Sequence, residues 1–155
     1  MKRLVIFDSV FGNTERIARA IGEGLGEAVV LPVAEVTLEH LQGLEILLVG
    51  SPTRSWHATP AIDHFLNNIP PGGLKGVRVS AFDTRLSLED TRSAFTRFIV
   101  RTGSYAVKSI TRTLMEKGGT ICLVPEGFLV LGDKGPLKEG ELERAREWAA
   151  RCPRH

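Results

Sequence analysis

Hydrophobic and polar positions divide the chain into two kinds of segment. Short, nearly continuous apolar runs are typical of strands buried on both faces. They cover residues 4–7, 28–33, 44–50, 77–82 and 120–124. Between these runs, apolar residues recur every three or four positions, which predicts helices with one buried face. The helical faces are Ile17, Ile21 and Leu25; Ile62, Phe65, Leu66 and Ile69; Val107, Ile110 and Leu114; and Leu142, Ala145, Trp148 and Ala149.

This alternation predicts an α/β fold, because strands separated by helices form a parallel sheet with right-handed crossovers. We expect a doubly wound three-layer sandwich, with five strands in the order 2-1-3-4-5 and helices on both faces. Pro32 suggests that the second strand lies at an edge. Residues 128–131 could continue the fifth strand beyond a bulge. Residues 83–103 show only a partial helical pattern. The whole chain, residues 1–155, is predicted to be one domain.

Composition is ordinary for a globular protein, at 43% hydrophobic and 25% charged residues with a net charge of +2. No apolar run is long enough for a membrane span, and the N-terminus does not resemble a signal peptide, so a cytoplasmic location is expected. The nearly balanced charge argues against a nucleic-acid partner. Cys122 and Cys152 lack the spacing of a metal site. Cys122 is expected in the core, and Cys152 is expected to be exposed.

A polar turn, Ser9–Thr14, separates the first strand from the first helix. Helix N-termini attract anions, Gly12 allows unusual backbone angles, and Ser9 and Thr14 supply hydroxyl groups. The turn lacks the lysine and second glycine of a nucleotide triphosphate loop. It could bind a phosphate monoester, or it could be an ordinary loop in which Asn13 or Thr14 caps the helix.

A second unusual loop, Ser51–Ala58, follows the third strand, and Thr59-Pro60 then marks a helix start. In the order 2-1-3-4-5, the winding of the sheet reverses between strands 1 and 3. Ligands of such sheets bind at this reversal, beyond the carboxyl ends of the strands. The two polar loops are therefore expected to form one site.

Together, Ser9-Val-Phe-Gly-Asn-Thr14 and Gly50-Ser-Pro-Thr-Arg-Ser-Trp-His57 resemble the two cofactor loops of the flavodoxin family. Residues 128–131 follow the interruption of the fifth strand almost at once, which resembles the short-chain type of this family. Phe11 replaces a hydroxyl residue of the family pattern. The resemblance covers nearly the whole chain and implies bound FMN. By position, the phosphate would be held by Ser9, Gly12, Asn13 and Thr14, with backbone N–H groups of Val10 and Phe11.

The same resemblance places the flavin ring between two further segments. One side would be lined by Pro52, Thr53, Arg54, Ser55, Trp56 and His57, and the other side by Asp83, Thr84 and Arg85. Trp56 is interpreted as a stacking residue because a flat ring favours an aromatic platform, although Trp56 could instead cap the core.

Three departures from the family pattern bear on redox chemistry. No tyrosine closely follows the fourth strand, since the only one is Tyr105, so one flavin face could be open. Arg54, His57 and Arg85 give the ring a cationic environment, unless both arginines point to solvent. Cations stabilise a reduced anion, which predicts a second reduction potential less negative than in acidic flavodoxins. The segment 51–59 contains no glycine, which disfavours the backbone flip that supports one-electron chemistry in this family.

The function expected from this resemblance is electron transfer by an FMN-bound carrier between redox partner proteins. The alternative is an FMN-dependent NAD(P)H:quinone oxidoreductase, in which His57 could protonate an acceptor or merely face solvent. A receiver domain is excluded because no aspartate ends the third strand, and a module that has lost FMN remains a further alternative. The basic residues within the segment Leu86–Gly103, namely Arg92, Arg97 and Arg101, suggest an acidic partner. No catalytic side chain, metal or membrane contact is assigned, and a monomer or weak dimer is expected.

Overall fold

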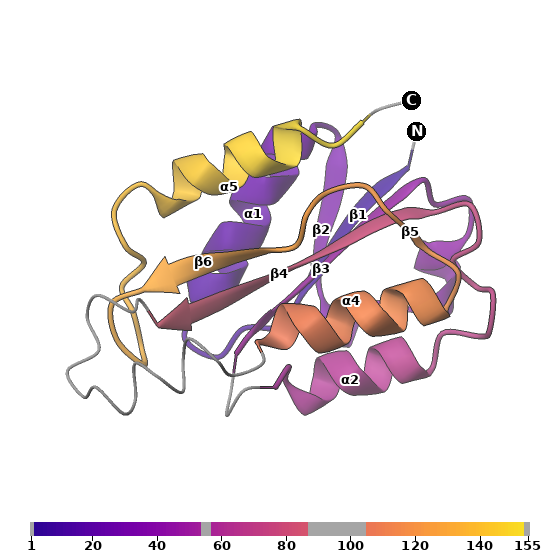
Figure 1. Cartoon of the computed structure of the whole chain (residues 1–155), viewed down its shortest axis with the longest axis horizontal. Coiled ribbons are helices and arrows are strands. Elements are labelled where there is room, and N and C mark those ends of the chain that lie inside the picture. Colours follow the sequence, from indigo (N-terminus) through magenta and orange to yellow (C-terminus); the bar gives the residue numbers. More distant parts are fainter. Residues whose placement is uncertain (1, 54–56, 87–104, 154–155) are drawn as a thin grey trace.

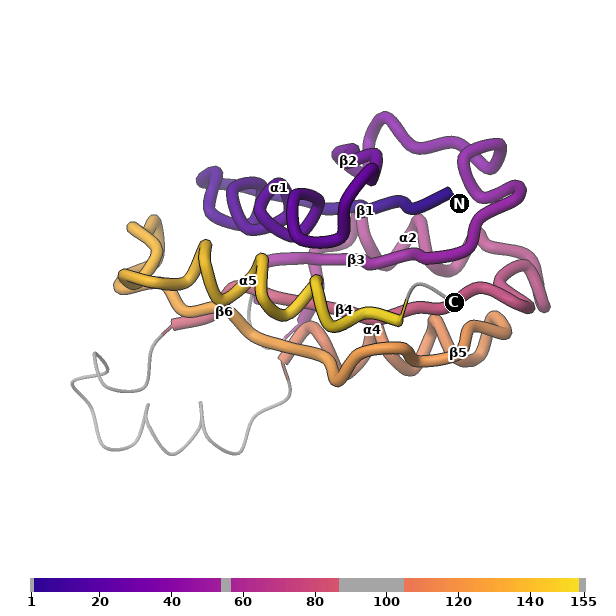
Figure 2. Tube along the Cα trace, turned by 90° about the horizontal axis from the view of Figure 1, so that it is seen from above, coloured from indigo at the N-terminus to yellow at the C-terminus, as the bar shows by residue number. Residues whose placement is uncertain are grey.

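The computed structural model describes residues 2–53, 57–86 and 105–153, and its centre is one twisted parallel sheet (Figure 1). Its strand order, β2-β1-β3-β4-β5 with β6 also paired to β4, confirms the predicted winding. Figure 2 shows this order from the β2 edge to the β5 edge. Pro32 lies on the edge strand, as expected. The strands are β1 (Arg3–Phe7), β2 (Ala28–Pro32), β3 (Ile46–Pro52), β4 (Arg78–Leu86), β5 (Thr120–Ile121) and β6 (Glu126–Val130).

Helices cover both faces of the sheet, as the alternating pattern predicts. α1 (Asn13–Leu25) and α5 (Glu141–Ala150) lie together on one face. On the other face lie α2 (Pro60–Asn67) and α4 (Ala106–Glu116) (Figure 1). Two short 3₁₀ segments, η1 (Val33–Glu35) and η2 (Leu38–Leu41), connect β2 to β3. The expected three-layer sandwich is therefore present.

Alternation along the strands produces one hydrophobic core on each face of the sheet. In β1, Leu4 and Ile6 pack with the residues of α2 and α4, whereas Val5 and Phe7 pack with those of α1 and α5. Successive side chains of a strand point to opposite faces, so a continuous apolar run supplies both cores. The sheet is thereby fixed in register, because a shift by one residue would exchange the two faces.

The fifth strand is divided by an insertion. Val79 of β4 is paired with Ile121, but Phe82 is paired with Glu126, so the four residues 122–125 face only two residues of β4. Two carbonyl groups of the insertion are bound by side chains: the Ser80 hydroxyl donates to Leu123 O at 2.8 Å, and the indole N–H of Trp148 donates to Val124 O at 2.8 Å. The predicted bulge exists, and it begins earlier than expected.

β4 is longer than the apolar run 77–82 indicated. β6 pairs with Phe82–Leu86, so Asp83, Thr84 and Arg85 belong to the strand and not to a loop after it. The sequence pattern stops at Phe82 because polar residues follow, and the pairing partner that extends the strand lies 44 positions away in the sequence.

One prediction about the C-terminus is wrong. Cys152 is not exposed: its relative accessibility is 3%, and it contacts Cys122. Trp148 is a core residue, as expected, and its ring packs edge-on against Phe82 and Phe128 with centroid distances of 6.3 and 6.0 Å. Within the described ranges, no helix has both the length and the apolar character needed to span a membrane.

An ion pair attaches the start of α5 to β6. The Glu141 carboxylate accepts the Leu129 N–H at 2.7 Å and two N–H groups of Arg144 at 2.9 and 2.6 Å. Arg144 also donates to Gly127 O at 2.6 Å and lies 4.6 Å from the centroid of the Phe128 ring. Burial alone would raise the pKa of Glu141, but these hydrogen bonds and the Arg144 charge outweigh it, so the pKa lies below its ordinary value of 4.5.

Replacing Glu141 by Gln is expected to lower the free energy of unfolding at pH 7 by about 1–3 kcal/mol, because a charge-assisted contact is lost. The folded-state pKa is lowered, so this contribution is present above pH 4.5 and is lost as the pH falls through the folded-state pKa. Urea denaturation between pH 7 and pH 3 measures both effects. Glu143→Gln, at a side chain that is 66% exposed, is the control and should change stability by less than about 0.5 kcal/mol.

Candidate cofactor site at the carboxyl ends of the strands

The turn Ser9–Thr14 lies at the carboxyl end of β1 and leads directly into α1. It is joined to β3 by the Asp8 N–H, which donates to Gly50 O at 3.1 Å. Gly12 has φ of 90°, the left-handed conformation that glycine adopts without strain. The Ser9 hydroxyl accepts the Gly12 N–H at 3.1 Å and, more weakly, the Glu15 N–H at 3.4 Å. Gly12 is the N-cap, so neither Asn13 nor Thr14 caps the helix.

Backbone donors of the turn remain available for a ligand. Among the described residues, nothing accepts a hydrogen bond from the N–H groups of Val10, Asn13 or Thr14. These groups lie at the N-terminus of a 13-residue helix, where the helix dipole favours an anion. The Ser9 hydroxyl accepts hydrogen bonds in the turn and still has its own proton to donate. The turn has the chemistry of an anion site.

Threonine side chains connect the turn to the other strand ends. The hydroxyl groups of Thr14 and Thr84 are 2.8 Å apart and buried. The Thr53 N–H donates to Thr84 O at 3.0 Å, so the chain leaving β3 continues beside β4. The structure therefore brings together the turn, Pro52-Thr53 and Asp83–Arg85, three segments that the sequence assigned to one site.

Asp83 is fully buried in this arrangement, and its carboxylate is occupied by protein donors. It accepts the Arg85 Nε and Nη2 groups at 2.7 and 2.9 Å, the Thr53 hydroxyl at 3.1 Å and the Val107 N–H at 3.3 Å. Burial raises the pKa of Asp83 above its ordinary value of 3.8, and the contacts with Arg85, Val107 and Thr53 oppose that rise. Asp83 thus anchors β3, β4 and the start of α4.

Arg85 does not point into solvent, since its side chain is only 20% exposed. Its guanidinium carbon lies 3.5 Å from the centroid of the Tyr105 ring, a cation–π contact. Gly127 leaves the space that this group occupies, because a Cβ built there would lie 2.2 Å from the guanidinium carbon. The Asp83 carboxylate offsets the Arg85 charge, so the cationic environment expected from the sequence is weaker here than predicted.

The remaining predicted residues differ in how they are placed. Val10 and Phe11 are 53% and 47% exposed, and His57 is also exposed. Arg54, Ser55 and Trp56 lie outside the described residues, as does most of the segment 86–103, so the stacking interpretation of Trp56 stays a prediction. Asn13 lies against Gly135, where a Cβ would be 2.7 Å from the Asn13 amide oxygen.

Two side chains near the site were not predicted. Tyr105 contacts Arg85, although it lies far along the chain from the end of β4 and was not assigned to the site from the sequence. Lys134, in the connection between β6 and α5, has its ammonium group 5.9 Å from the centroid of the Phe11 ring. Lys134 therefore places a positive charge beside the turn. In the sequence, the one signal for this position was a lysine between Gly132 and Gly135.

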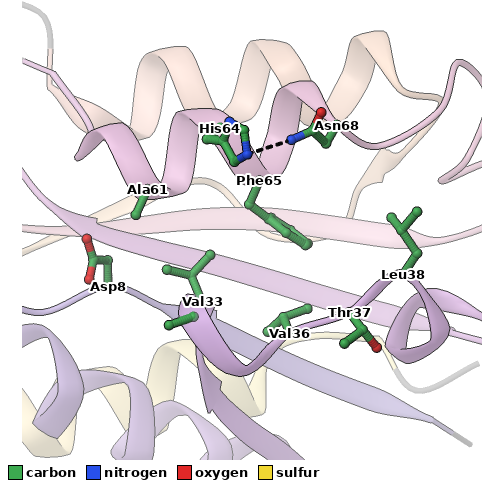
Figure 3. Close-up of a pocket in the computed structure, with 10 residues that line it drawn as sticks. Asp8, Val33, Val36, Thr37, Leu38, Ala61, His64, Phe65 and Asn68 are labelled. Atoms are coloured by element: carbon green, nitrogen blue, oxygen red, sulfur yellow. Dashed lines mark hydrogen bonds between the residues drawn. The ribbon is translucent and has the colours of Figure 1, made fainter.

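A separate hollow of about 450 Å³ opens on the α2 face, next to the carboxyl end of β1 (Figure 3). Asp8 borders it at one end, and Val33, Val36 and Phe65 form its apolar wall. On its rim, His64 of α2 and Asn68, the residue that follows this helix, are joined by a 3.0 Å hydrogen bond. Among the described residues, none of those assigned to the cofactor site from the sequence lines this hollow.

The sequence profile of the flavodoxin family matches residues 5–148, and the chain belongs to this family. Flavodoxins bind FMN. The solved structures that resemble the chain include short-chain flavodoxins. A search of curated protein sequences finds no match to the chain.

Similar solved structures support the fold. Flavodoxin 1 from Bacillus cereus is 19% identical, with a TM-score of 0.75 over 97% of this chain and 96% of that one. A flavodoxin from the domain Archaea is 20% identical, with a TM-score of 0.72 over 97% and 94% of the two chains. The rubredoxin oxygen:oxidoreductase of Desulfovibrio gigas is 18% identical, with a TM-score of 0.72, and only 35% of that chain is covered. The fold thus exists both alone and as part of a larger enzyme.

Replacing Arg85 by Met is expected to lower the free energy of unfolding at pH 7 by about 3–5 kcal/mol, because it leaves the buried Asp83 charge without a counter-ion. The loss should decrease as the pH falls, since a raised pKa means that the folded state binds the proton more tightly than the unfolded state. Denaturant unfolding at several pH values measures this. The double variant Asp83→Asn/Arg85→Met should recover most of the loss, and the exposed control Arg16→Met should be neutral within about 0.5 kcal/mol.

Proposed function

We propose that this protein is an FMN-dependent electron carrier that exchanges electrons with redox partner proteins. The observation that carries the proposal is the turn Ser9–Thr14, whose Val10, Asn13 and Thr14 N–H groups have no acceptor among the described residues. This turn lies where β1, β3 and β4 end together. A doubly wound sheet holds its ligand at this position. Family membership indicates which ligand is bound, and the chemistry of the turn agrees with a phosphate monoester.

The residues present fit FMN. The unoccupied N–H groups of Val10, Asn13 and Thr14, together with the Ser9 hydroxyl, suit the oxygens of a phosphate. Gly12 has open space where a Cβ would project, so a ligand can approach its backbone. Lys134 adds a positive charge near Phe11. When bound, FMN supplies the electron-transfer chemistry, and the protein positions and tunes it.

On this proposal, the residues around the ring divide into contacts and supports. Pro52, Thr53, His57 and Thr84, together with Arg54, Ser55 and Trp56, would line the ring. Asp83 has its oxygens occupied by Arg85, Thr53 and Val107, so its role is to hold the strand ends in position. Arg85 is held by the same carboxylate and by Tyr105, which makes it a fixed wall of the site.

Ser9→Ala is expected to weaken FMN binding by about 10–100-fold, because it removes a hydroxyl group that would donate to the charged phosphate and also holds the turn. Riboflavin lacks the phosphate, so its affinity should change by less than about threefold. Quenching of flavin fluorescence measures both dissociation constants. Ser109→Ala, whose hydroxyl binds Ala106 O within α4, is the matched control.

An equal loss for FMN and riboflavin would show that the turn supports the fold and does not bind phosphate. No affinity for FMN in the unchanged protein would contradict the proposal as a whole and would leave only the role of a binding module without flavin.

The carrier role predicts that NAD(P)H alone does not reduce the FMN-loaded protein, whereas dithionite or a flavodoxin reductase does. The physical reason is that a carrier exchanges electrons at its surface and needs no site for a nicotinamide. Anaerobic titration followed by visible absorption measures this. Rapid bleaching by NAD(P)H in one two-electron step would establish the quinone reductase alternative instead.

Further details of the role are part of the same proposal. We infer an acidic partner surface from the basic residues Arg92, Arg97 and Arg101, which fall outside the described residues. We also propose that the protein is cytoplasmic and that it is a monomer or weak dimer. The second reduction step of its FMN is proposed to have a less negative potential than in acidic flavodoxins.

A further inference from the structure

The two cysteines of the chain meet at the end of the sheet away from the cofactor site. Cys122 begins the insertion in the fifth strand, where its N–H donates to Val79 O at 3.0 Å. Cys152 follows α5, and its N–H donates to Ala149 O at 3.0 Å. Although 30 positions separate them, their Sγ atoms are 3.1 Å apart and both thiols are free. Two elements that pack on different parts of the sheet are therefore joined by a dithiol contact.

The contact is already close to the geometry of a bond. A disulfide requires an S–S distance of about 2.05 Å, so closure moves the two sulfurs by about 1 Å in total. Cys122 is partly exposed, so a small oxidant can reach the pair, whereas Cys152 is only 3% exposed. Among the described residues, no group of three metal-ligating side chains exists, so a metal site does not account for the pair.

The contact between the thiols, together with nearby positive charges, favours Cys152 as the thiolate of the pair. The hydrogen bond between the two thiols lowers the pKa of Cys152, burial opposes this, and the positive charges of Arg78 and Arg3 lower it further. The same hydrogen bond, together with burial, raises the pKa of Cys122. Arg78 also donates to Pro153 O, the carbonyl of the residue that follows Cys152. Cationic surroundings of this kind are typical of reactive cysteines.

We propose that Cys122 and Cys152 are a redox modification site that closes reversibly to a disulfide when the protein meets hydrogen peroxide. The Cys152 thiolate attacks one peroxide oxygen, the O–O bond breaks, and the departing hydroxide takes a proton to become water. The Cys122 thiol then attacks the sulfenic sulfur of Cys152, forming the S–S bond and releasing the second oxygen as water. Each sulfur is oxidised by one electron, and each peroxide oxygen is reduced by one.

The disulfide would connect the insertion of the fifth strand to the end of α5 and enclose β6 and α5 in one covalent loop. Such a loop stabilises the folded state by restricting the unfolded chain. Disulfides in a reducing compartment are usually transient, so the closed form would mark a period of oxidation. The site stands independently of FMN binding, because it lies beside Val79 and not beside Asp83–Arg85.

The test treats the reduced protein with a small excess of hydrogen peroxide. We expect both free thiols to disappear, the intact mass to fall by about 2 Da, and a peptide map to show Cys122 joined to Cys152 in a monomer. The melting temperature should rise by about 5–10 °C and return to its original value after dithiothreitol. An unchanged mass, a gain of oxygen atoms or a covalent dimer would overturn the proposal.

Two matched variants test which sulfur reacts first. Each variant is treated with hydrogen peroxide in the presence of dimedone, which labels sulfenic acids. Cys152 in the Cys122→Ser variant should be labelled about tenfold faster than Cys122 in the Cys152→Ser variant. The reverse order would overturn the assignment of Cys152 as the nucleophile. The mass and peptide map of the unchanged protein decide the main proposal even if a variant fails to fold.

Discussion

The buried carboxylate of Asp83 is the interaction on which the functional edge of the molecule depends. One side chain receives hydrogen bonds from the end of β3, from its own strand and from the first turn of α4. A charge without water must be fully paired, so these three segments cannot move apart independently. The two predicted ring-lining segments leave from this fixed point. The precision of a site on loops therefore comes from a polar contact beneath them and not from the loops themselves.

The same edge shows how a fold can weaken an electrostatic effect that the sequence suggests. Arg85 appeared as an uncompensated cation near the flavin, but its charge is held against Asp83 and its plane against Tyr105. A neutral pair has a field that decreases faster with distance than that of a single charge. Positive charge near the turn is instead supplied by Lys134, from a loop after β6. The charge near a cofactor therefore cannot be predicted from the number of charged residues in its loops, because the ion-pair partners of those residues also matter.

Much of the fold could be predicted because its signals are local. Apolar runs and helical spacing indicated the strands and helices, and the alternation indicated a parallel sheet with helices on both faces. Features that depend on distant pairing could not be predicted. β4 continues through Asp83–Arg85 only because β6 lies beside it. The burial of Cys152 depends on where α5 ends, and the contact of Tyr105 with Arg85 spans a long segment without a clear pattern.

The candidate site shows the same division. Ser9–Thr14 could be recognised because a glycine and hydroxyl residues between strand and helix have a local meaning. The hydrogen bonds that occupy the Asp83 carboxylate could not be predicted, because the donors come from three separate places in the chain.

The insertion at residues 122–125 has a consequence for how molecules of this protein meet each other. It divides the outer edge of the sheet into strands of two and five residues. An exposed sheet edge offers unpaired backbone groups to any passing strand, and a long straight edge is a template for aggregation. The insertion turns its Leu123 and Val124 carbonyls inward to Ser80 and Trp148. A neighbouring chain would therefore find no continuous ladder to extend, so the interruption protects this edge of the sheet from pairing with another molecule.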